Sequence, residues 1–568
     1  MSMNIYRGSV LYIAVFIILA VVLSGILISG NLPASETISS QVSKDIRNRV
    51  VAGFPQRVTI RGKTINASAF LPLFYDRRLY RPVWSNDKGL LPSVYSLLKV
   101  VRKAHEEGLR PEDYYHIIAI ESVLNEIRLN QNKKIPPKAG RLADLDLLLT
   151  DLFFMYGCHL LSGKVNPETV EPEWFANRRN VDIVEILENV LAENQIEKEL
   201  KNLLPPYPGY SLLKDSLKRY REIDSKGGWP AIPAGNKMQK GDSGERVVLL
   251  HNRLVLTGDF ISQEVKNIYF FDEDIAKAVR RFQERHGLSV DSIVGPATLA
   301  SLNVPVHERV RQIELNMERW RWLPHDLGQR YILVNIAGFE LDLVEKSETM
   351  LKMRVVVGKQ YRQTPVFSGR MTYLVLNPSW HVPVNIAVKD KLPLILKDAG
   401  YLSGENIKIF EKWGTEKKEI DPKTVDWSKV TADNFHYRLV QEPGPSNALG
   451  RIKFMFPNSF NVYLHDTPSR ELFSKTVRSF SSGCIRIEKP VELAEYLLKD
   501  APEWTAEKIR SVIEKGKEQI ILLRNPVPVH VIYWTAWANN DGSINFRDDI
   551  YGRDKKLLLA LKEKPPSK

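Results

Sequence analysis

The spacing of hydrophobic residues changes several times along this 568-residue chain. The first segment, from Ser9 to Ser29, has no charged residue, and about 20 apolar residues in succession can cross a bilayer as a helix. This run is longer than that of a signal peptide, and no small-residue cleavage site follows it. We therefore predict a short tip and a transmembrane anchor over residues 1–30. The polar, aperiodic residues 31–60 are predicted to form a linker.

Apolar residues recur at intervals of three and four in the next segment, for example from Leu90 to Glu107 and from Ala143 to Leu161. This period is typical of amphipathic helices that pack together. We predict an all-α domain over residues 61–228, with the thiol of Cys158 buried and inert. A glycine- and proline-rich hinge from Ser225 to Gly235 follows it.

A small module of three short helices is predicted over residues 236–304. Glycines end the helical stretches. Its core is expected where three groups of apolar and small side chains meet, which are Val248, Leu250 and Leu254, then Ala278, Val279 and Phe282, and finally Thr298, Leu299 and Leu302.

Helical spacing continues from Val310 to Trp322 and then changes to the alternation typical of strands. We predict a connecting helix within residues 305–329 and a mostly-β domain over residues 330–535. Residues 387–449 interrupt the strands with helical pieces at 389–397 and 406–412, and are predicted to form a helical lid. Residues 536–568 follow as a C-terminal extension. The whole chain is thus predicted to be multidomain α+β.

Composition and charge limit the chemistry that the chain can support. Lys and Arg total 80 against 67 Asp and Glu, and the formal net charge of +13 favours polyanionic partners. Two cysteines are too few for a disulfide framework or a cysteine-rich zinc site. The 11 histidines are scattered and form no H-E-x-x-H pair. We expect no metal and no other cofactor.

Reactive side chains gather in two short strand-like stretches late in the β-rich domain. In a strand, alternate side chains share a face. Tyr463 and His465 therefore point the same way, and so do Cys484 and Arg486, while the residues between them are apolar. Two adjacent strands would bring these four groups together.

The residue types at this site suit cysteine acyl transfer. An imidazole such as that of His465 can take the proton of the Cys484 thiol and stabilise the thiolate. Gly483 leaves space beside the sulfur, and backbone N–H groups around Gly483 and Cys484 can hold an oxyanion. Arg486 can orient a carboxylate with its planar guanidinium. We predict Cys484 as the nucleophile and His465 as the general base and acid.

The small helical module resembles the three-helix peptidoglycan-binding module. It contains G-D-S-G at residues 241–244, A-V-x-x-F-Q-x-x-H-G-L at residues 278–288 and V-G-P-x-T-L at residues 294–299. The family usually has Asp-Gly where this chain has Asp291-Ser292. The resemblance implies glycan binding, and a generic three-helix spacer is the alternative.

The β-rich domain resembles the L,D-transpeptidase catalytic domain, whose signature is a histidine followed by S-x-G-C-x-R. Here these are His465 and Ser481 followed by the stretch Ser482-Gly483-Cys484-Ile485-Arg486. Many members have a histidine where this chain has Ser482. The likeness extends through further stretches, which are Val357-Gly358, Thr364-Pro365, Asn377–Trp380, Gly450–Asn458 and Val527–Tyr533.

The order of anchor, scaffold, module and catalytic domain is similar to that of the large three-domain Gram-negative L,D-transpeptidases. This resemblance implies that a single N-terminal helix anchors the chain in the inner membrane and that the bulk of the chain is periplasmic. It also implies that peptidoglycan stem peptides are the substrates. Cell-wall synthases are candidate partners, and no nucleic acid is expected.

The resemblance further implies a reaction. Cys484 attacks a diaminopimelate carbonyl of a donor stem to form a thioester, and the amine of a second diaminopimelate resolves it into a 3-3 cross-link. Alternative acceptors are water, a D-amino acid or a lipoprotein lysine, and carbapenems are expected to acylate Cys484. Tyr463 is expected to orient substrate or support the oxyanion. The expected substrate-binding residues are Arg486, Ser482, Ser481 and Trp380.

Other functions are compatible with parts of this pattern. A non-catalytic wall tether would use only the module. A serine penicillin-binding enzyme is disfavoured because the S-x-x-K match at Ser211–Lys214 has no accompanying K-T-G. A papain-like hydrolase is disfavoured because its cysteine precedes its histidine, whereas His465 precedes Cys484 here.

Overall fold

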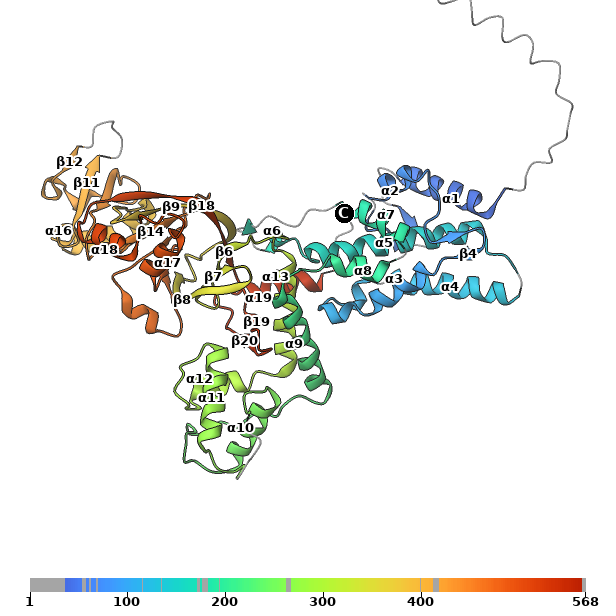
Figure 1. Ribbon diagram of the computed structural model, residues 1–568, viewed down its shortest axis with the longest axis horizontal. Coiled ribbons are helices and arrows are strands. Elements are labelled where there is room, and N and C mark those ends of the chain that lie inside the picture. Colours follow the sequence, from blue (N-terminus) through green and yellow to red (C-terminus); the bar gives the residue numbers. More distant parts are fainter. Residues whose placement is uncertain are drawn as a thin grey trace, which may run out of the picture.

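The computed structural model describes residues 36–53, 58–60, 63–67, 70–114, 116–133, 135–170, 174–175, 182–193, 195–261, 267–398, 400–411 and 418–563. The predicted membrane anchor at residues 9–29 lies outside these ranges. The described part has three arms, which are a helical scaffold, a small helical module and a β-rich domain (Figure 1). They meet around α9 (Pro208–Ser225) and α13 (Val306–Arg321).

The scaffold begins earlier than the sequence suggested. The predicted linker at residues 31–60 is wrong over α1 (Ile38–Gly53), which packs against α5 (Ala139–Ser162). Val42, Ile46 and Val50, four residues apart, are at most 1% exposed. Three apolar residues among serines and charges are a weak periodic signal, yet they are enough to bury one face of a helix.

The other scaffold elements surround α5. The helices are α2 (Leu71–Arg77), α3 (Ser93–Arg102), α4 (His116–Asn132), α6 (Pro167–Val170), α7 (Ile183–Glu193) and α8 (Ile196–Asn202), with 3-10 turns at Ala104–Glu107 and Pro111–Tyr114. Short strands β1 (Thr59–Ile60) and β2 (Lys63–Thr64) pair with each other, and so do β3 (Ser85–Asn86) and β4 (Gly89–Leu90). β5 (Trp174–Phe175) instead pairs in parallel with β9 (Val366–Leu376) of the β-rich domain.

Among the described helices, α5 alone is long and apolar enough to cross a membrane. It is instead the core helix of the scaffold, because 89% of its apolar window is buried inside the protein. Cys158 lies on this helix, half-buried against the scaffold core.

The module contains the three predicted helices, α10 (Glu245–Leu256), α11 (Glu273–His286) and α12 (Pro296–Leu302). Asp272 caps α11 by accepting a hydrogen bond from the N–H of Ile275, and Gly287 ends it in the left-handed conformation. The expected core forms around Leu250 and Phe282. One position differs, because Val247 rather than Val248 is fully buried.

The β-rich domain is built on one sheet that closes on itself, because β14 pairs with both β15 and β9. Its strands are β5, β6 (Arg330–Asn335), β7 (Glu340–Glu345), β8 (Glu348–Gly358), β9 (Val366–Leu376), β14 (Ile452–Met455), β15 (Leu464–His465), β16 (Ser479–Ser481), β17 (Ile485–Ile487) and β18 (Gln519–Ile532). A core of branched and aromatic residues fills it, together with apolar residues of α17 (Pro490–Leu497) and α18 (Ala506–Glu514).

The insertion at residues 387–449 is only partly helical. It contains a π-helix at Ala387–Lys391, α15 (Leu392–Lys397) and α16 (Tyr401–Gly404), and α14 (Val384–Ile386) precedes it. The helix predicted at residues 406–412 is wrong, because β11 (Ile407–Glu411) lies there, paired with β12 (Glu419–Ile420) and β13 (Tyr437–Gln441). Ile407 and Ile409 are buried while Lys408 between them is exposed, which is the two-residue period of a strand. This segment, with β10 (Trp380–His381), is called the lid below.

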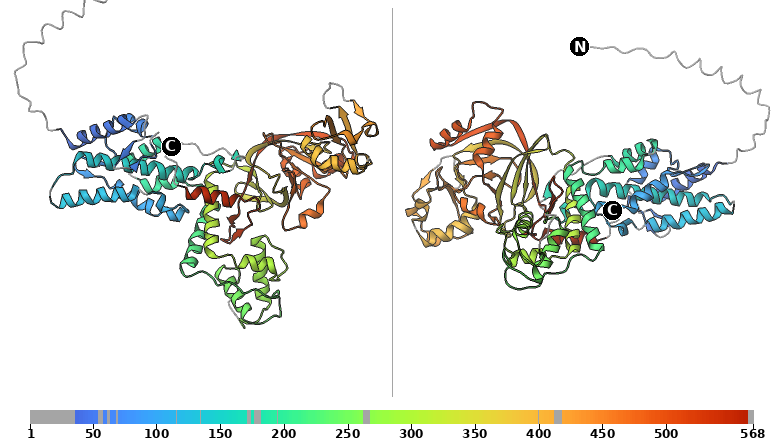
Figure 2. Two further views of the ribbon diagram at one scale, coloured as in Figure 1. Left: turned by 180° about the vertical axis from the view of Figure 1, so that it is seen from behind. Right: turned by 60° about the horizontal axis from the view of Figure 1, so that its bottom comes forward.

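The C-terminal residues are an integral part of the fold. β19 (Ala536–Ala538) and β20 (Ile544–Phe546) form a hairpin, and α19 (Arg553–Lys562) packs on α13. In both views of Figure 2 this segment lies at the junction of the arms. Arg285 of the module donates to the carbonyl of Ile544 at 3.1 Å, and Arg547 donates to that of Arg285 at 2.8 Å. The predicted extension therefore connects the module to the β-rich domain.

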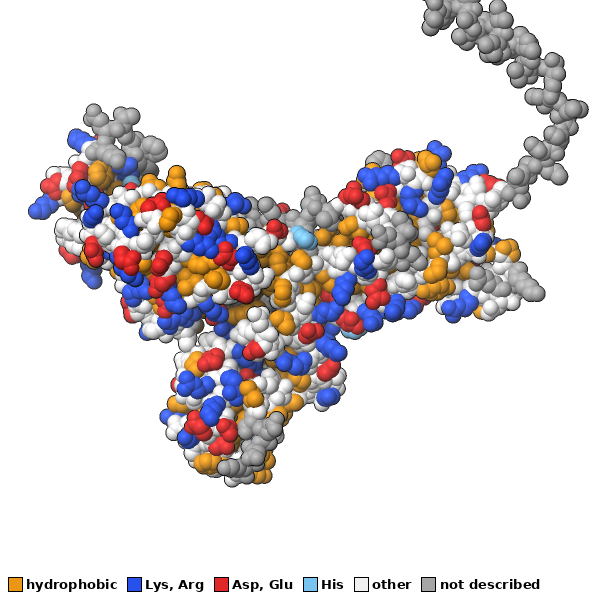
Figure 3. Space-filling view, in the orientation of Figure 1, with side chains coloured by type: hydrophobic (Ala, Val, Ile, Leu, Met, Phe, Trp, Pro, Cys, Tyr) orange, Lys and Arg blue, Asp and Glu red, His pale blue; other side chains and the backbone are white. Residues whose placement is uncertain are grey.

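Charged side chains of both signs are interspersed on the face that Figure 3 shows. The net positive charge is therefore not gathered into one basic patch on that face. Several cationic side chains gather instead around one cavity.

Candidate active site

A cavity of about 960 Å³ opens between the lid and the closed sheet, and all eight predicted site residues line it. They are Trp380, Tyr463, His465, Ser481, Ser482, Gly483, Cys484 and Arg486. The structure thus brings together every residue that the sequence suggested, from three separate stretches of the chain.

The pairing of β15 with β17 creates this convergence. The two strands are parallel, with Leu464 opposite Ile485 and His465 opposite Arg486. Leu464 and Ile485 are fully buried in the core. Because side chains alternate along a strand, the neighbours of these core residues point to the cavity. His465 thus lies in β15, and Cys484 lies directly before β17, the strand that pairs with it.

The nucleophile follows a tight turn at Ser481–Cys484. The Ser481 hydroxyl donates to the carbonyl of Cys484 at 2.5 Å and accepts from the N–H of Gly483 at 3.2 Å. Gly483 has φ +116°, a conformation that favours glycine. Through these two hydrogen bonds Ser481, which is 3% exposed, holds the turn together. Contact of Ser481 with substrate stays a prediction.

The turn changes the expectation for the oxyanion donors. The N–H of Gly483 already donates to Ser481. Within the described turn, the N–H of Cys484 has no hydrogen-bond partner. The resting structure therefore offers Cys484, rather than Gly483, as the free backbone donor.

The Cys484 thiol is neutral at rest. Burial raises its pKa, while hydrogen bonds from the Tyr463 backbone and hydroxyl, and the charges of Lys453 and Arg486, act in the opposite direction. The thiol donates to the carbonyl of Asn461 at 3.8 Å. No hydrogen bond joins it to His465 in the part of the chain that the structure describes.

His465 is also neutral, and its tautomer follows from its contact. Burial, followed by the positive charge of Arg486, lowers its pKa to about 3. Its Nδ1 lies 2.5 Å from the carbonyl oxygen of Asp466. A carbonyl can only accept, so Nδ1 carries the proton and Nε2 keeps a lone pair. The imidazole is thus in the form that can accept a proton from a thiol.

Tyr463 lies between the two reactive side chains. Its ring contacts that of His465 edge to face, with centroids 5.7 Å apart. Burial and the neighbouring Cys484 raise its pKa, so the hydroxyl keeps its proton. An orienting role for Tyr463 fits this position and stays a prediction.

Lys453 is a site residue to which the sequence analysis gave no role. It lies on β14, opposite His465 in the β14–β15 pair, and its ammonium is 4.1 Å from the centre of the Tyr463 ring. Burial lowers its pKa. The alternation within Gly450–Asn458 was a usable signal, because Ile452 and Phe454 face the core and Lys453 between them must face away.

Five cationic side chains line the cavity, namely Lys359, Lys389, Lys391, Lys453 and Arg486. Within the described residues, none of them forms an ion pair. Asp390 is the one acidic residue among the described lining residues, and Arg362 binds it. The same arginine donates to the hydroxyl of Ser482 at 2.9 Å. The cavity is therefore suited to an anionic ligand.

Trp380 forms part of the lid side of the cavity. Its side chain is 8% exposed, and the ammonium of Lys391 lies 5.4 Å from its ring. Lys391 also donates to the hydroxyl of Tyr401 at 2.7 Å. Substrate contact by Trp380 stays a prediction.

Comparison with known families agrees with the three arms. Residues 69–217 match a scaffold domain, residues 243–302 match a family described as "Putative peptidoglycan binding domain", and residues 329–520 match the L,D-transpeptidase catalytic domain. A protein of Haemophilus influenzae named "Putative L,D-transpeptidase" is 36% identical over 250 residues, which are 44% of this chain and 49% of that protein. The chain thus spans about half the length of this relative.

Solved structures show only a distant likeness. An L,D-transpeptidase from Stackebrandtia nassauensis is 13% identical, with 53% of this chain and 96% of that chain covered and a TM-score of 0.20. One from Xylanimonas cellulosilytica is 14% identical, with 53% and 99% covered and a TM-score of 0.16. These scores are too low to support a structural argument.

Proposed function

We propose that the cavity around Cys484 is the active site of an L,D-transpeptidase. The chain matches a scaffold domain, a peptidoglycan-binding domain and an L,D-transpeptidase catalytic domain. One observation carries the proposal. The parallel pairing of β15 with β17 places a cysteine and a neutral histidine on the same cavity.

The acylation step uses both neutral groups. The Cys484 sulfur attacks the carbonyl of the diaminopimelate residue in a donor tetrapeptide stem, and its proton passes to Nε2 of His465. A carbon–sulfur bond forms. The carbon–nitrogen bond to D-alanine then breaks, and the leaving amine takes the proton from His465. Because no hydrogen bond joins thiol and imidazole at rest, substrate binding must bring them into contact.

The second step transfers the acyl group to an acceptor. The side-chain amine of a second diaminopimelate attacks the thioester and loses a proton to His465, and the thiol is regenerated. The product is a 3-3 cross-link. Water, a D-amino acid or a lipoprotein lysine would resolve the same thioester in the same way.

The charge of the cavity supports a stem peptide as substrate. Five cations line the cavity, and none of them pairs with an acidic side chain among the residues that the structure describes. A donor stem carries free carboxylates, which can pair with them as they leave water. Arg486 lies nearest in sequence to the nucleophile and is suited to the carboxylate beside the reacting carbonyl.

The location of the enzyme is part of the proposal. Residues 9–29 would anchor it in the inner membrane, with its folded part in the periplasm, where stem peptides and cell-wall synthases are found. The module at residues 243–302 would hold it near glycan strands.

Mass spectrometry of the full-length protein tests the activity. After incubation with a disaccharide tetrapeptide, we expect an adduct on Cys484 with loss of D-alanine, and diaminopimelate-to-diaminopimelate dimers among the products. Cys484→Ala should abolish both, whereas Cys158→Ala, at a half-buried position against the scaffold core, should retain both. Dimer formation by Cys484→Ala would disprove the assignment, and binding of sacculi without any product would favour a tether.

A further inference from the structure

The peptide group between Gly483 and Cys484 is held on one side by a buried hydroxyl. The Thr364 hydroxyl donates to the carbonyl of Gly483 at 2.9 Å, and Thr364 is fully buried. The carbonyl and the N–H of a trans peptide lie in one plane and point in opposite directions. Fixing the Gly483 carbonyl therefore fixes the direction of the Cys484 N–H, the free donor of the nucleophile turn.

Thr364 is in turn held by Tyr551. The N–H of Thr364 donates to the Tyr551 hydroxyl at 3.3 Å, and that hydroxyl donates to the carbonyl of Gly358 at 2.5 Å. The N–H of Gly358 donates to the Thr364 hydroxyl at 2.9 Å. One tyrosine oxygen thus joins the end of β8 to the residue that holds Gly483. Phenylalanine at this position would leave two buried backbone groups without this partner.

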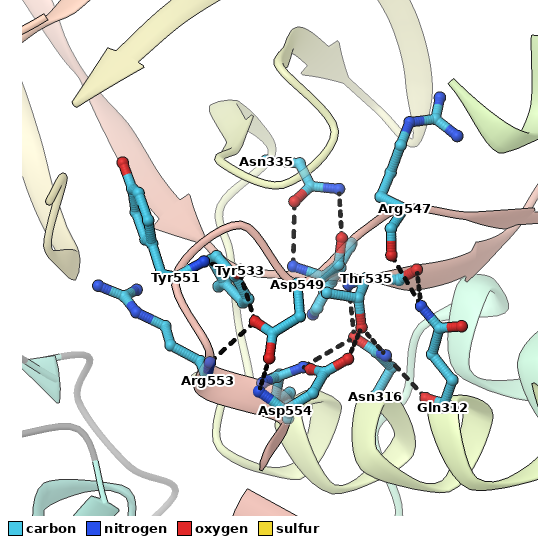
Figure 4. Close-up of polar contacts among 12 residues, drawn as sticks. Gln312, Asn316, Asn335, Tyr533, Thr535, Arg547, Asp549, Tyr551, Arg553 and Asp554 are labelled. Atoms are coloured by element: carbon cyan, nitrogen blue, oxygen red, sulfur yellow. Dashed lines mark hydrogen bonds and ion pairs between the residues drawn. The ribbon is translucent and has the colours of Figure 1, made fainter. Parts of the chain in front are cut away.

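Tyr551 itself is buried within the C-terminal segment. It is 4% exposed, its ring stacks on that of Tyr533 with centroids 5.7 Å apart, and its N–H donates to the Tyr533 hydroxyl at 3.0 Å. Asp549 accepts from the Tyr533 hydroxyl at 2.7 Å and from the N–H of Arg553 at 2.8 Å. Figure 4 shows the Tyr551 ring extending from this network, with its hydroxyl at the far end.

The network continues to the helix that joins the three arms. Asp554 accepts from the hydroxyl of Thr535 at 2.8 Å and pairs with Arg319 of α13 at 2.5 Å. Asn316 of α13 accepts from the N–H of Thr535 at 3.0 Å (Figure 4). Hydrogen bonds therefore run from α13 through Tyr551 to the nucleophile turn. Tyr551 lies beyond residue 520, where the match to the catalytic domain ends.

We propose that Tyr551 is a positioning residue for the reaction, which acts through Thr364 to direct the N–H of Cys484 at the oxyanion. It touches neither the substrate nor the sulfur. The inference rests on the proposed function, because an oxyanion forms only if Cys484 is acylated. A purely structural role would affect the thiol and the oxyanion donor alike, whereas a positioning role affects the donor alone.

Two reactions of the same sulfur separate these roles. Alkylation by iodoacetamide displaces iodide and builds no oxyanion, whereas acylation by a disaccharide tetrapeptide does. In Tyr551→Phe of the full-length protein, we expect single-turnover acylation to fall about tenfold with alkylation unchanged, since small displacements of catalytic groups are costly. The KM for the donor should stay constant. Thr364→Val should show a larger fall, and Thr364→Ser should recover most of the rate.

The decisive measurement is the ratio of the acylation rate to the alkylation rate, taken for each variant relative to the unmodified protein. Tyr496→Phe, which removes a hydroxyl bonded to Glu345, is the control and should leave the ratio unchanged, because neither residue lines the cavity. An unchanged ratio in Tyr551→Phe, or an equal fall in both rates, overturns the proposal. Absence of acylation in the unmodified protein would instead disprove the proposed function.

Discussion

Lys453 on β14 lies directly opposite His465 on β15. This register places an ammonium on the same cavity as the nucleophile, and the ring of Tyr463 covers it at 4.1 Å. A partly buried cation without an acidic partner interacts strongly with any negative charge that forms nearby. The thiolate of Cys484 is such a charge.

Replacement of Lys453 by Met should make the thiol less reactive. The positive charge of Lys453 lowers the pKa of Cys484 against the effect of burial, so its removal should raise that pKa further. We expect several-fold slower alkylation by iodoacetamide near neutral pH and a profile displaced to higher pH. Lys453→Arg keeps the charge and should resemble the unmodified protein. If Lys453→Met has the unmodified profile, the ammonium does not act on the sulfur.

The pH dependence of Cys484 should show no titration of His465 near pH 6.5. Burial lowers the pKa of this histidine to about 3 and raises the pKa of the thiol. The imidazole is therefore neutral throughout the ordinary range, while the thiolate fraction increases with pH. Alkylation in the free protein should rise steadily from about pH 6 to 9. An inflection near 6.5 that disappears in His465→Ala would contradict this reasoning.

His465→Ala should separate acylation from alkylation. Loss of a general base typically costs about 10²- to 10⁴-fold in rate, and we expect acylation by a tetrapeptide donor to fall by this amount. Alkylation at high pH needs no base and should change little. His436→Ala, an exposed histidine of the lid, is the matched control. Equal losses in both reactions would indicate a collapsed site rather than a missing base.

Replacement of Arg362, but not of Asp390, should weaken the affinity for an anionic donor. Their ion pair connects the lid to the turn beside Cys484 through Ser482. Arg362→Met leaves Asp390 unpaired on the cavity, and a change of about 1 kcal/mol for this partly exposed pair should raise KM about fivefold. Asp390→Asn removes the negative charge and should not raise KM. Lys408→Met, in an exposed lid pair with Glu419, should leave KM unchanged. Equal increases in both variants would mean that lid attachment, rather than charge, sets KM.

The sequence predicted the residues of the active site better than it predicted the structure around them. Two-residue alternation placed Tyr463 with His465 and Cys484 with Arg486, because each stretch is a strand with one apolar face. The register of β15 against β17 is set by the closed sheet, and sequence could only suppose it. The sequence could not predict the position of Tyr551 either, since no local pattern links it to Thr364, almost 200 residues earlier in the chain.

The limits of individual elements were harder to predict from the sequence than the secondary-structure type of each domain. Helices of the scaffold and module and the main strands follow from periodicity. The segment at 406–412 was predicted to be helical, and its pairing with β13 makes residues 407–411 a strand. The helix at 38–53 has few apolar residues, and the apolar residues of the C-terminal hairpin lie in two strands of only three residues each. The helix is ordered by packing on α5, and the hairpin by packing on α9, α13 and α11. These partners are distant in sequence, so local periodicity does not reveal them.

The buried pair of Arg285 and Asp259 should hold the module together. Both residues are at most 6% exposed, and Arg285 also reaches the carbonyl of Ile544. Arg285→Met leaves a buried carboxylate unpaired, which typically costs about 3–5 kcal/mol. Hydrogen exchange in urea should therefore show earlier unfolding of residues 243–302. Lys240→Met, in an exposed pair with Glu273, should show no measurable change. Similar behaviour of the two variants would mean that the buried pair is dispensable.

His159 should make the scaffold less stable in acid. Burial, followed by Lys164 and Arg321, lowers its pKa to about 3, whereas an unfolded chain has the ordinary value near 6.5. At pH values between these two pKa values, His159 is protonated in the unfolded state but not in the folded state. The free energy of unfolding therefore falls as pH falls. Asp146 on the same helix acts in the opposite sense, because burial raises its pKa to about 6 and the folded state then binds the extra proton as pH falls.

Comparison of His159→Gln with the unmodified protein isolates this histidine, since Asp146 is common to both. At pH 5 the protonation difference of His159 amounts to about 2 kcal/mol relative to pH 7, and the variant should lack it. Glutamine keeps an acceptor for the Tyr114 hydroxyl, which lies 3.1 Å from His159 Nδ1. His105→Gln changes an exposed histidine and should follow the unmodified curve. Urea unfolding at several pH values gives the measurement, and parallel curves for His159→Gln and the unmodified protein would show that His159 titrates normally in the fold.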